Sequence, residues 1–448
     1  MSLQLTTTPY KFLYDLCKSR IKLAYRELKS IHFDNGKTEN LKHAARILVY
    51  MFPIALHLRR IYFPVYLLCL IMSIPVVLLV RLVLPIVHIR FGRIYAPSFG
   101  QSVLISEVYL SRRKAGFDEP NTVDLFYFHG DIRNQQLGRM IRRKMFVNPL
   151  IQPFYDANLY LSGLGGWKTH LVKSPSYYTE RDVEYSFLEV PPQLSFLNEE
   201  LEQVKTELMK YGMKPGDKFV CFYCRDQGYQ LNSASLGHCY DVDQFPFIID
   251  KFIDAGYYVL RMGKNVEKPM TYSHPRVIDY GWEYQSDLMD IWLTANCEIF
   301  INSGGGLACA AVAFRRHLIC INYEVFSFFS TAKDSLVSFR RFKRDGKYLT
   351  LREMIDLGFR EIMRLPMDTK QTEIQIEDLS EQEILDIIDE MISRLNGTWE
   401  IKNDLVEMQE KFWSILKEWD GFHSWHGDKL LCQVSHNYML QNQDWLLK

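Results

Sequence analysis

Hydrophobic and polar positions from about residue 89 onward follow two alternating periods. Short runs rich in Val, Ile, Phe and Tyr are each followed by a stretch in which apolar residues recur every three or four positions. The first pattern is typical of buried strands and the second of amphipathic helices. The clearest strands are "TVDLFYFHG", "KFVCFYCRD", "YYVLRMG", "EIFINSGGG" and "HLICIN". Their alternation with helices predicts an α/β fold built on parallel sheets.

The same pattern divides into two Rossmann-like halves, residues 89–200 and 201–360, separated by the paired prolines of "LEVPPQLSFLNEE". In the first half, "SVLISEVYLSRRKAG" and "RNQQLGRMIRRK" are expected helices, and "MFVNPLI" and "NLYLSG" are shorter candidate elements. Residues 361–448, with helices near Glu381–Leu395 and Asp404–Trp419, are expected to pack back on the body. Two such halves with a cleft between them form an architecture suited to nucleotide binding.

Residues 1–88 have a different character, basic and apolar. The run "IYFPVYLLCLIMSIPVVLLV" has 20 residues without a charge, which is long enough to span a bilayer. Pro64, Pro75 and Pro85 interrupt it, and arginines flank it on both sides. We therefore expect monotopic or re-entrant attachment through residues 46–88 at the cytoplasmic face of the inner membrane. A single span and a buried helix of a soluble domain are the alternatives.

Charge supports a lipid partner for this region. Residues 1–114 carry 17 Lys and Arg against 5 Asp and Glu, and the remaining 334 residues carry 36 against 48. A basic segment on an acidic body favours anionic head groups as a partner, and no nucleic acid partner is expected. The nine cysteines, an odd number, fit reduced thiols. Cys221 and Cys224 lie along one strand and face opposite sides, so they do not indicate a metal site.

The stretch "IFINSGGGLACAAVAFRRHLICIN" leaves a strand through Asn302, Ser303 and the glycines Gly304, Gly305 and Gly306. Glycine permits a sharp strand-to-helix turn. It also exposes backbone N–H groups to an anion at the start of a helix. A packing turn and a phosphate-binding loop are therefore both open.

Polar residues follow several strands of the second half, where ligands of parallel sheets bind. The candidate donor contacts are Arg225, Arg261, Asp279, Tyr280 and the Asn302–Gly306 loop. An arginine at a strand tip suits a diphosphate, because its guanidinium binds two oxygens at once. Candidate catalytic bases are Asp226 and, in "YFHGDIRNQQL" of the first half, His129 and Asp131. For each residue alone, a helix cap or a solvated charge explains its presence equally well.

Several other chemistries lack their signatures. The sequence contains no GxGxxG after the first strand, no GxSxG and no P-loop. Asp241 and Asp243 are explained by helix capping, and no motif compels a metal site. We expect no metal and no cofactor, with a nucleotide-sugar acting as substrate.

The segments "FVCFYCRDQGY", "DAGYYVLRMGK", "SDLMDIWLTANCEIFINSGGGL" and "DGKYLTLREMI" together resemble a family of bacterial glycosyltransferases of the GT-B type, associated with surface-polysaccharide synthesis. "IRFGRIY" and "DIRNQQLGRMIRRKM" are similar to the first half of that family, so the resemblance covers roughly residues 89–358. The arrangement is also distantly similar to protein O-fucosyltransferases, which implies that Arg225 meets the nucleotide diphosphate.

The resemblance implies a glycosyltransferase that moves a sugar from a nucleotide-activated donor to a glycan acceptor, lipid-linked if the membrane prediction holds. Arg225 and the Asn302–Gly306 loop would neutralise the leaving diphosphate in place of a metal. Two alternatives remain: a catalytically inactive membrane scaffold of the same fold, and a nucleotide-dependent epimerase or dehydrogenase.

Overall fold

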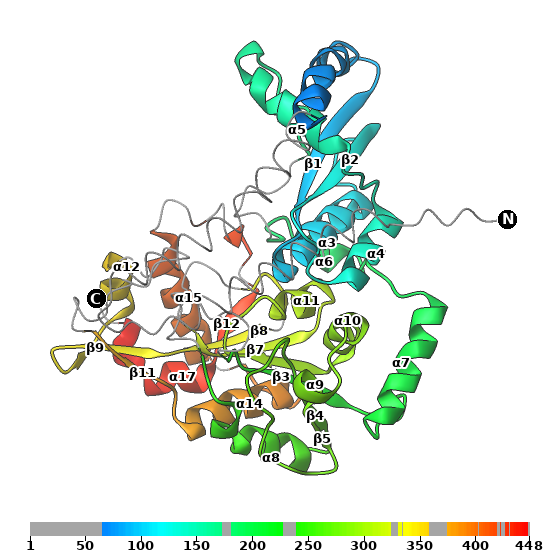
Figure 1. Cartoon of the computed structure of the whole chain (residues 1–448). Helices are drawn as coiled ribbons and strands as arrows, with labels where there is room; N and C mark the ends of the chain where they lie inside the picture. The colour runs from blue at the N-terminus through cyan, green and yellow to red at the C-terminus, as the bar shows by residue number, and fades with distance from the viewer. Residues whose placement is uncertain are drawn as a thin grey trace, which may run out of the picture. The chain divides into compact units, whose positions relative to one another are not determined.

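The computed structural model describes residues 65–172, 181–226, 239–323, 330–333, 335–357, 374–401, 403–418, 422, 426–429 and 431–446 (Figure 1). The chain divides into two compact units, which are described separately. One comprises Met1–Ile86 and Gln152–Trp167, and the other comprises Val87–Ile151 and Lys168–Lys448. Residues 46–64 of the predicted attachment region lie outside the described residues.

A seven-stranded sheet with the order β12-β8-β7-β6-β3-β4-β5 forms the centre of the larger unit, and its neighbouring strands are all parallel. The strands are β3 (Phe219–Tyr223), β4 (Tyr258–Arg261), β5 (Val277–Ile278), β6 (Ile299–Asn302), β7 (His317–Tyr323), β8 (Ser335–Phe339) and β12 (Cys432–Val434). β6 is buried at every position, as expected of a strand covered on both faces. This confirms the α/β fold with a parallel sheet.

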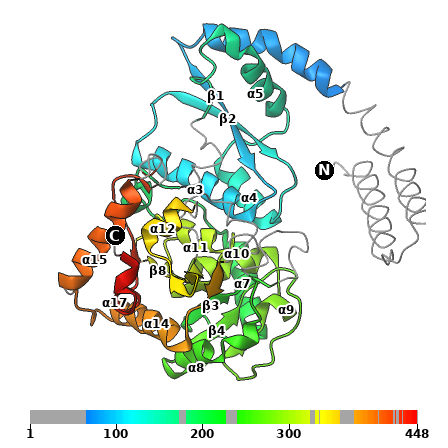
Figure 2. The same ribbon diagram turned by 90° about the vertical axis from the view of Figure 1, so that its left-hand side faces the viewer.

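Helices cover both faces of this sheet. α8 (Pro246–Asp254) and α14 (Glu381–Leu395) lie on one face, and α10 (Asp287–Asn296) and α11 (Ala308–Ala313) lie on the other (Figures 1 and 2). Ser380 and Glu383 form a reciprocal cap that fixes the start of α14, where the sequence predicts it. The other helices and strands of the second half are α7 (Asn198–Lys210), α9 (Tyr280–Glu283), α12 (Leu351–Asp356), β9 (Arg341–Arg344) and β10 (Lys347–Tyr348). The region 361–448 adds β11 (Gln375–Glu377), α15 (Asn403–Lys417) and α17 (His436–Gln441).

The first half contributes a smaller parallel pair, β1 (His88–Tyr95) and β2 (Thr122–His129), with α3 (Phe99–Ala115), α4 (Gln135–Lys144) and α6 (Ser186–Glu189). α3 ends at Gly116, whose φ of 78° suits a left-handed helix cap. "MFVNPLI" makes only an isolated bridge, between Val147 and Phe126. "NLYLSG" ends α5 (Ile151–Tyr160) and forms the short helix η1 (Leu161–Leu164).

The two halves pack through α3 and α11 within one compact unit, so the division at residue 200 stays a prediction. Glu107 of α3, with a side chain fully buried, accepts a hydrogen bond from Arg315 Nη1 at 2.7 Å. Arg315 also donates to Ser111 Oγ at 2.9 Å. Burial raises the pKa of Glu107, while Arg315 opposes that rise. Arg315 therefore compensates the negative charge of Glu107, which is buried where α3 packs on α11.

Candidate functional site

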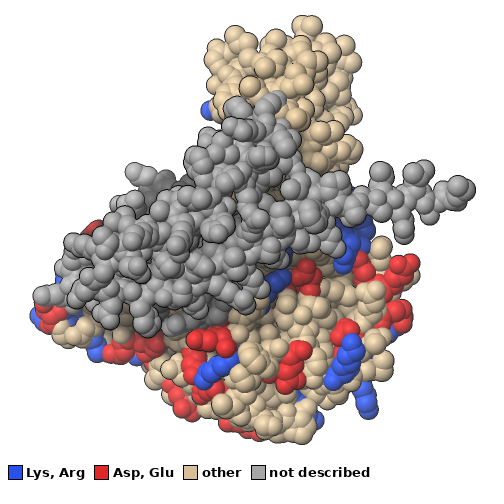
Figure 3. Space-filling model, viewed as in Figure 1, with Lys and Arg blue, Asp and Glu red and all other residues tan. Residues whose placement is uncertain are grey.

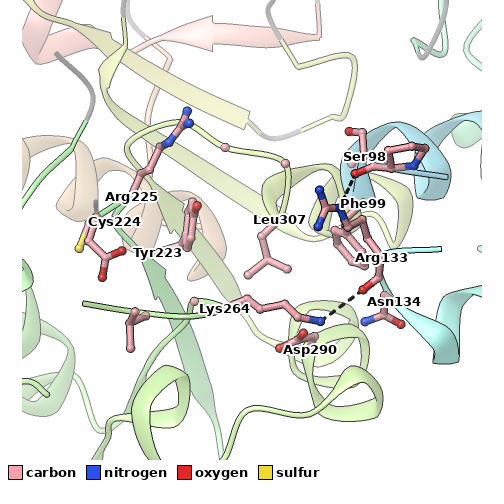
Figure 4. Close-up of a pocket in the computed structure, with 17 residues that line it drawn as sticks. Ser98, Phe99, Arg133, Asn134, Tyr223, Cys224, Arg225, Lys264, Asp290 and Leu307 are labelled. Carbon is pink, nitrogen blue, oxygen red and sulfur yellow. Dashed lines mark hydrogen bonds between the residues drawn. The ribbon is translucent and has the colours of Figure 1, made fainter. Parts of the chain in front are cut away.

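A cavity of about 250 Å³ lies at the carboxyl ends of β3 and β6, beside the start of α3 (Figure 4). The first half lines it with Ser98–Gly100, Arg133 and Asn134, and the second half with Tyr223–Asp226, Lys264, Asp290 and Gly305–Leu307. Open parallel sheets bind their ligands at this end of the strands. The cavity is therefore the position at which the fold favours a ligand.

The glycine turn after β6 has a demonstrable packing role. Gly304 N donates to Asn302 Oδ1 at 2.9 Å, and the buried Asn302 also donates to Ile319 O at 3.2 Å. Gly304 has φ of 107° and Gly305 has φ of 145°, conformations that L side chains rarely adopt. A Cβ on Gly305 would lie 2.5 Å from the ring of Tyr223. Asn302 and Ser303 are almost fully buried, so they shape the turn and do not face the cavity.

Gly306 serves the contact between the halves. A Cβ on Gly306 would lie 3.3 Å from Gly100 N, and one on Gly100 would lie 2.9 Å from Cys309 Sγ. The packing interpretation therefore accounts for these glycines without a ligand. Gly305 and Gly306 nevertheless line the cavity with bare backbone. Their contact with phosphate stays a prediction.

Two helices begin at the cavity, and the longer of the two is α3, not α11. α11 has only six residues, fewer than "LACAAVAFRR" suggests, and α3 has 17. Ser98 caps α3 by accepting from Gln101 N at 3.4 Å, and no acidic residue lies in its first turn. The first N–H groups of a helix have no partner within the helix and favour an anion. In the sequence, the signal for the start of α3 was Ser98, a serine that follows the first strand.

Three cationic side chains line the cavity, Arg225, Arg133 and Lys264. In the view of Figure 4, Arg225 and Arg133 lie on opposite sides of Leu307, with Lys264 below them. Arg133 Nε donates to Pro97 O at 2.9 Å. Lys264 Nζ donates to Asp287 Oδ1 at 2.9 Å and to Arg133 O at 3.3 Å. Lys264 was missed by sequence reasoning although it directly follows "YYVLRMG".

Arg261, Asp279 and Tyr280 are placed away from the cavity lining. Arg261 is 3% exposed and donates to Asp279 at 3.3 Å and to Asp226 Oδ2 at 3.2 Å. Arg261 therefore braces the loops after β3 and β5, and it also lines a smaller cavity of about 150 Å³ beside Asp226. Its contact with a donor stays a prediction. Tyr280 is fully buried, and its hydroxyl donates to Asp290 Oδ1 at 2.7 Å. The donor contacts proposed below do not use these three residues.

The three candidate bases differ in whether they line the cavity. Asp226 lines the cavity, although its carboxylate accepts from Arg261 and from Glu267 N at 2.9 Å. His129 ends β2 and stacks on Tyr95 with ring centroids 5.8 Å apart. Asp131 is exposed. Neither His129 nor Asp131 belongs to the cavity lining, so only Asp226 of the three is brought to the site.

A further carboxylate, Asp290 of α10, lines the cavity and was missed as a site residue. It accepts from Tyr280 at one oxygen and from Gln285 Nε2 at 2.7 Å at the other. Burial raises its pKa to about 6, while hydrogen bonds from Tyr280 and Gln285 and the charge of Lys264 oppose the rise. A buried carboxyl with a pKa near neutrality is typical of a functional group. An acidic residue on the apolar face of "SDLMDIWLTANC" was the signal available in the sequence.

Within the described ranges, no group of three or more His, Cys, Asp or Glu side chains could hold a metal ion. That the site works without a metal stays a prediction. Cys221, Cys224, Cys297 and Cys320 are buried free thiols, and burial raises the pKa of Cys224 to about 12.

No protein-family model matches the chain, and no curated protein matches it. It is similar to the solved structure of a glycosyl transferase of family 9 from Veillonella parvula, with 12% identity over 69% of this chain and 98% of that one, at a TM-score of 0.42. It is also similar to the ADP-heptose lps heptosyltransferase II of E. coli, with 13% identity over 61% and 96% of the two chains, at 0.34. A UDP-GlcNAc 2-epimerase from Neisseria meningitidis, bound to UDP-GlcNAc, shares 8% identity over 52% and 82%, at 0.26. Because these TM-scores lie below 0.5, the function is inferred from the chain's own geometry.

Proposed function

We propose that this protein is a glycosyltransferase that transfers a sugar from a nucleotide-activated donor to a glycan acceptor. The observation that carries the proposal is the cavity at the ends of the parallel strands β3 and β6. It combines bare backbone at Gly305 and Gly306 with the cations Arg225, Arg133 and Lys264. Backbone N–H groups and cations together are what a nucleoside diphosphate requires.

Arg225 and the start of α3 would stabilise the departing diphosphate. As the bond between the anomeric carbon and the diphosphate oxygen breaks, negative charge accumulates on that oxygen. Donors and cations already fixed around it lower the barrier without reorganising. We propose that these groups, with Lys264, supply the positive charge that a divalent metal provides in other transferases.

Asp290 is the carboxylate that we propose as general base. It would take the proton of the acceptor hydroxyl while the hydroxyl oxygen bonds to the anomeric carbon. The raised pKa of Asp290 suits this task, because a base works best when its pKa approaches the working pH. Asp226 is the second candidate, but its carboxylate is already engaged by Arg261 and by Glu267 N.

We further propose that the enzyme is attached to the cytoplasmic face of the inner membrane through residues 46–88 and acts on a lipid-linked acceptor. The helix Val65–Leu82 supports this attachment. By length and composition it could cross a membrane, with a mean hydropathy of 2.5 and 17% of its residues buried. Attachment would bring the enzyme to an acceptor that is confined to the bilayer.

The test begins with a panel of nucleotide-sugars, whose binding is detected by a rise in melting temperature. Calorimetry on the best donor then compares Arg225→Ala with Arg276→Ala, an exposed arginine outside the cavity lining. Loss of a charged hydrogen-bond partner should weaken donor binding about 10- to 100-fold for Arg225→Ala only. Equal affinity in both variants would refute the diphosphate assignment.

Product analysis separates the alternative functions. Acceptor-dependent release of nucleoside diphosphate supports transfer. A changed sugar still linked to its nucleotide would identify an epimerase, and bound nicotinamide absorbance would identify a dehydrogenase. Specific donor binding without any turnover across acceptors would favour the inactive scaffold.

A further inference from the structure

The smaller unit pairs the Val65–Leu82 helix with α5 and η1, which come from a distant part of the chain (Figures 1 and 2). Tyr66 OH donates to Asp156 Oδ2 at 2.5 Å. Arg81 Nη2 donates to Asn158 O at 2.9 Å and to Asn158 Oδ1 at 2.8 Å. Arg81 Nη1 reaches Leu161 O at 3.1 Å and Gly165 O at 2.9 Å. These contacts give Asp156 a hydrogen-bond donor and satisfy carbonyl groups at the end of α5 and in η1.

Apolar side chains cover the rest of this helical pair. Ser73, Val77 and Val80, which share one helix face, are buried. Leu68, Ile71, Met72, Leu79 and Leu82 are each more than half exposed, and no charged residue lies between Val65 and Val80. On α5 and η1, Tyr160 is 75% exposed and Leu164 is 69% exposed. Among the described residues of this unit that Figure 3 shows, few side chains are charged. A helix that is apolar all round and not buried in protein belongs in hydrocarbon.

The sequence around α5 has a composition that is typical of a membrane-contacting segment. From Met145 to Trp167 the only charged residue is Asp156, which Tyr66 binds. Arg142 and Lys144 precede this run and Lys168 follows it, whereas Arg143 is paired with Glu200 at 2.6 Å. Basic residues at both ends favour anionic head groups, and Tyr155, Tyr160 and Trp167 are of the residue types that suit the interface between water and lipid.

Element length and chain connectivity also restrict how α5 and η1 can sit in a bilayer. The first and last parts of the Val65–Leu82 helix, at Tyr66 and Arg81, bind Asp156 and Asn158, which are two residues apart. The helix is roughly 27 Å long for its 18 residues, so long side chains from both of its ends reach one short part of α5. α5 and η1, with 10 and 4 residues, are too short to span. Ile151, the first residue of α5, and Lys168 both belong to the other unit, so the chain enters and leaves α5–η1 from that unit.

We infer that α5–η1 is a second lipid-inserting element, which joins the Val65–Leu82 helix to form one monotopic anchor in an anionic bilayer. Tyr160 and Leu164 contact lipid directly. The inference rests on the proposed membrane attachment but not on the chemistry proposed for the cavity.

The test uses the full chain and flotation with vesicles of phosphatidylcholine and phosphatidylglycerol. Tyr160→Glu and Leu164→Glu are compared with Met209→Glu, which changes a residue of α7 that is 64% exposed and matches them in accessibility. Removing one inserted apolar side chain should lower the vesicle partition coefficient about tenfold or more. Met209→Glu should partition like the wild type. Unchanged melting temperature and donor affinity would show that the variants are folded.

Each outcome is informative. If the wild type floats and both α5–η1 variants float equally well, this inference fails and attachment through residues 46–88 stands. If the wild type does not float and light scattering shows a dimer, a second copy covers the apolar face and both claims fail. Tags at the two ends of the chain should be digested from the same side of sealed vesicles. Digestion from opposite sides would show a span and overturn the monotopic arrangement.

Discussion

Asp290 allows the proposed chemistry to be tested through pH. Its pKa rises from 3.8 to about 6 mainly because the carboxyl is buried. This change corresponds to about 3 kcal/mol of extra cost for ionising the group in the folded state. Between about pH 4 and 6, the folded protein retains a proton that the unfolded chain has lost. Stability therefore falls as pH rises through this window.

Replacing Asp290 with asparagine removes this titration. The free energy of unfolding of Asp290→Asn should fall less between about pH 4 and 6 than that of the wild type, by up to about 3 kcal/mol. Denaturant unfolding at a series of pH values measures the difference. If Asp290 is also the base, kcat should fall about 10²- to 10⁴-fold, because proton removal from the acceptor is lost.

The pH–rate profile of Tyr280→Phe gives the decisive result. In the wild type, kcat/KM should rise with pH and level off above about 6, as Asp290 ionises. The hydrogen bond from Tyr280 lowers the pKa of Asp290, so its loss should move the rising limb to higher pH. A limb that stays in place in Tyr280→Phe, or wild-type kcat in Asp290→Asn, would refute the assignment of Asp290 as base.

Three further predictions follow from the packing and charges of the site. Gly305→Ala should destabilise the protein by about 1–3 kcal/mol beyond Gly304→Ala, because only the first places a Cβ against Tyr223 while both residues have positive φ; equal melting temperatures would contradict this. Arg315→Ala should lower the free energy of unfolding by about 3–5 kcal/mol, because it leaves Glu107 buried without its cationic partner. The double variant Glu107→Gln with Arg315→Met should recover part of that loss in chemical denaturation. A double variant no more stable than Arg315→Ala would argue against a charge effect. Chelation with EDTA should leave donor turnover unchanged, because Arg225 and Lys264 supply the positive charge; a loss restored by Mg²⁺ would show that a metal is required.

The sequence by itself determined β3, β4, β6 and β7 of the parallel sheet and the apolar helix near the N-terminus, but it did not predict β8 and β12. The glycine-rich turn after β6 and the start of α14 also follow from local signals, because strand and helix periodicity, caps and turn residues act over a few positions. Arg225 could be placed at the site for the same reason, since it directly follows a strong strand.

Only the tertiary structure decided which of several neighbouring polar groups reach the cavity. Lys264 lines it whereas Arg261, three residues earlier, is held by Asp226 and Asp279. Asp290 lines the cavity, whereas Tyr280 is fully buried and does not. Likewise, the pairing of α5 with the Val65–Leu82 helix depends on Asp156 meeting Tyr66 across 90 residues of chain. Side-chain direction, burial and long-range pairing depend on what other parts of the chain pack against each residue, and local sequence does not encode that packing.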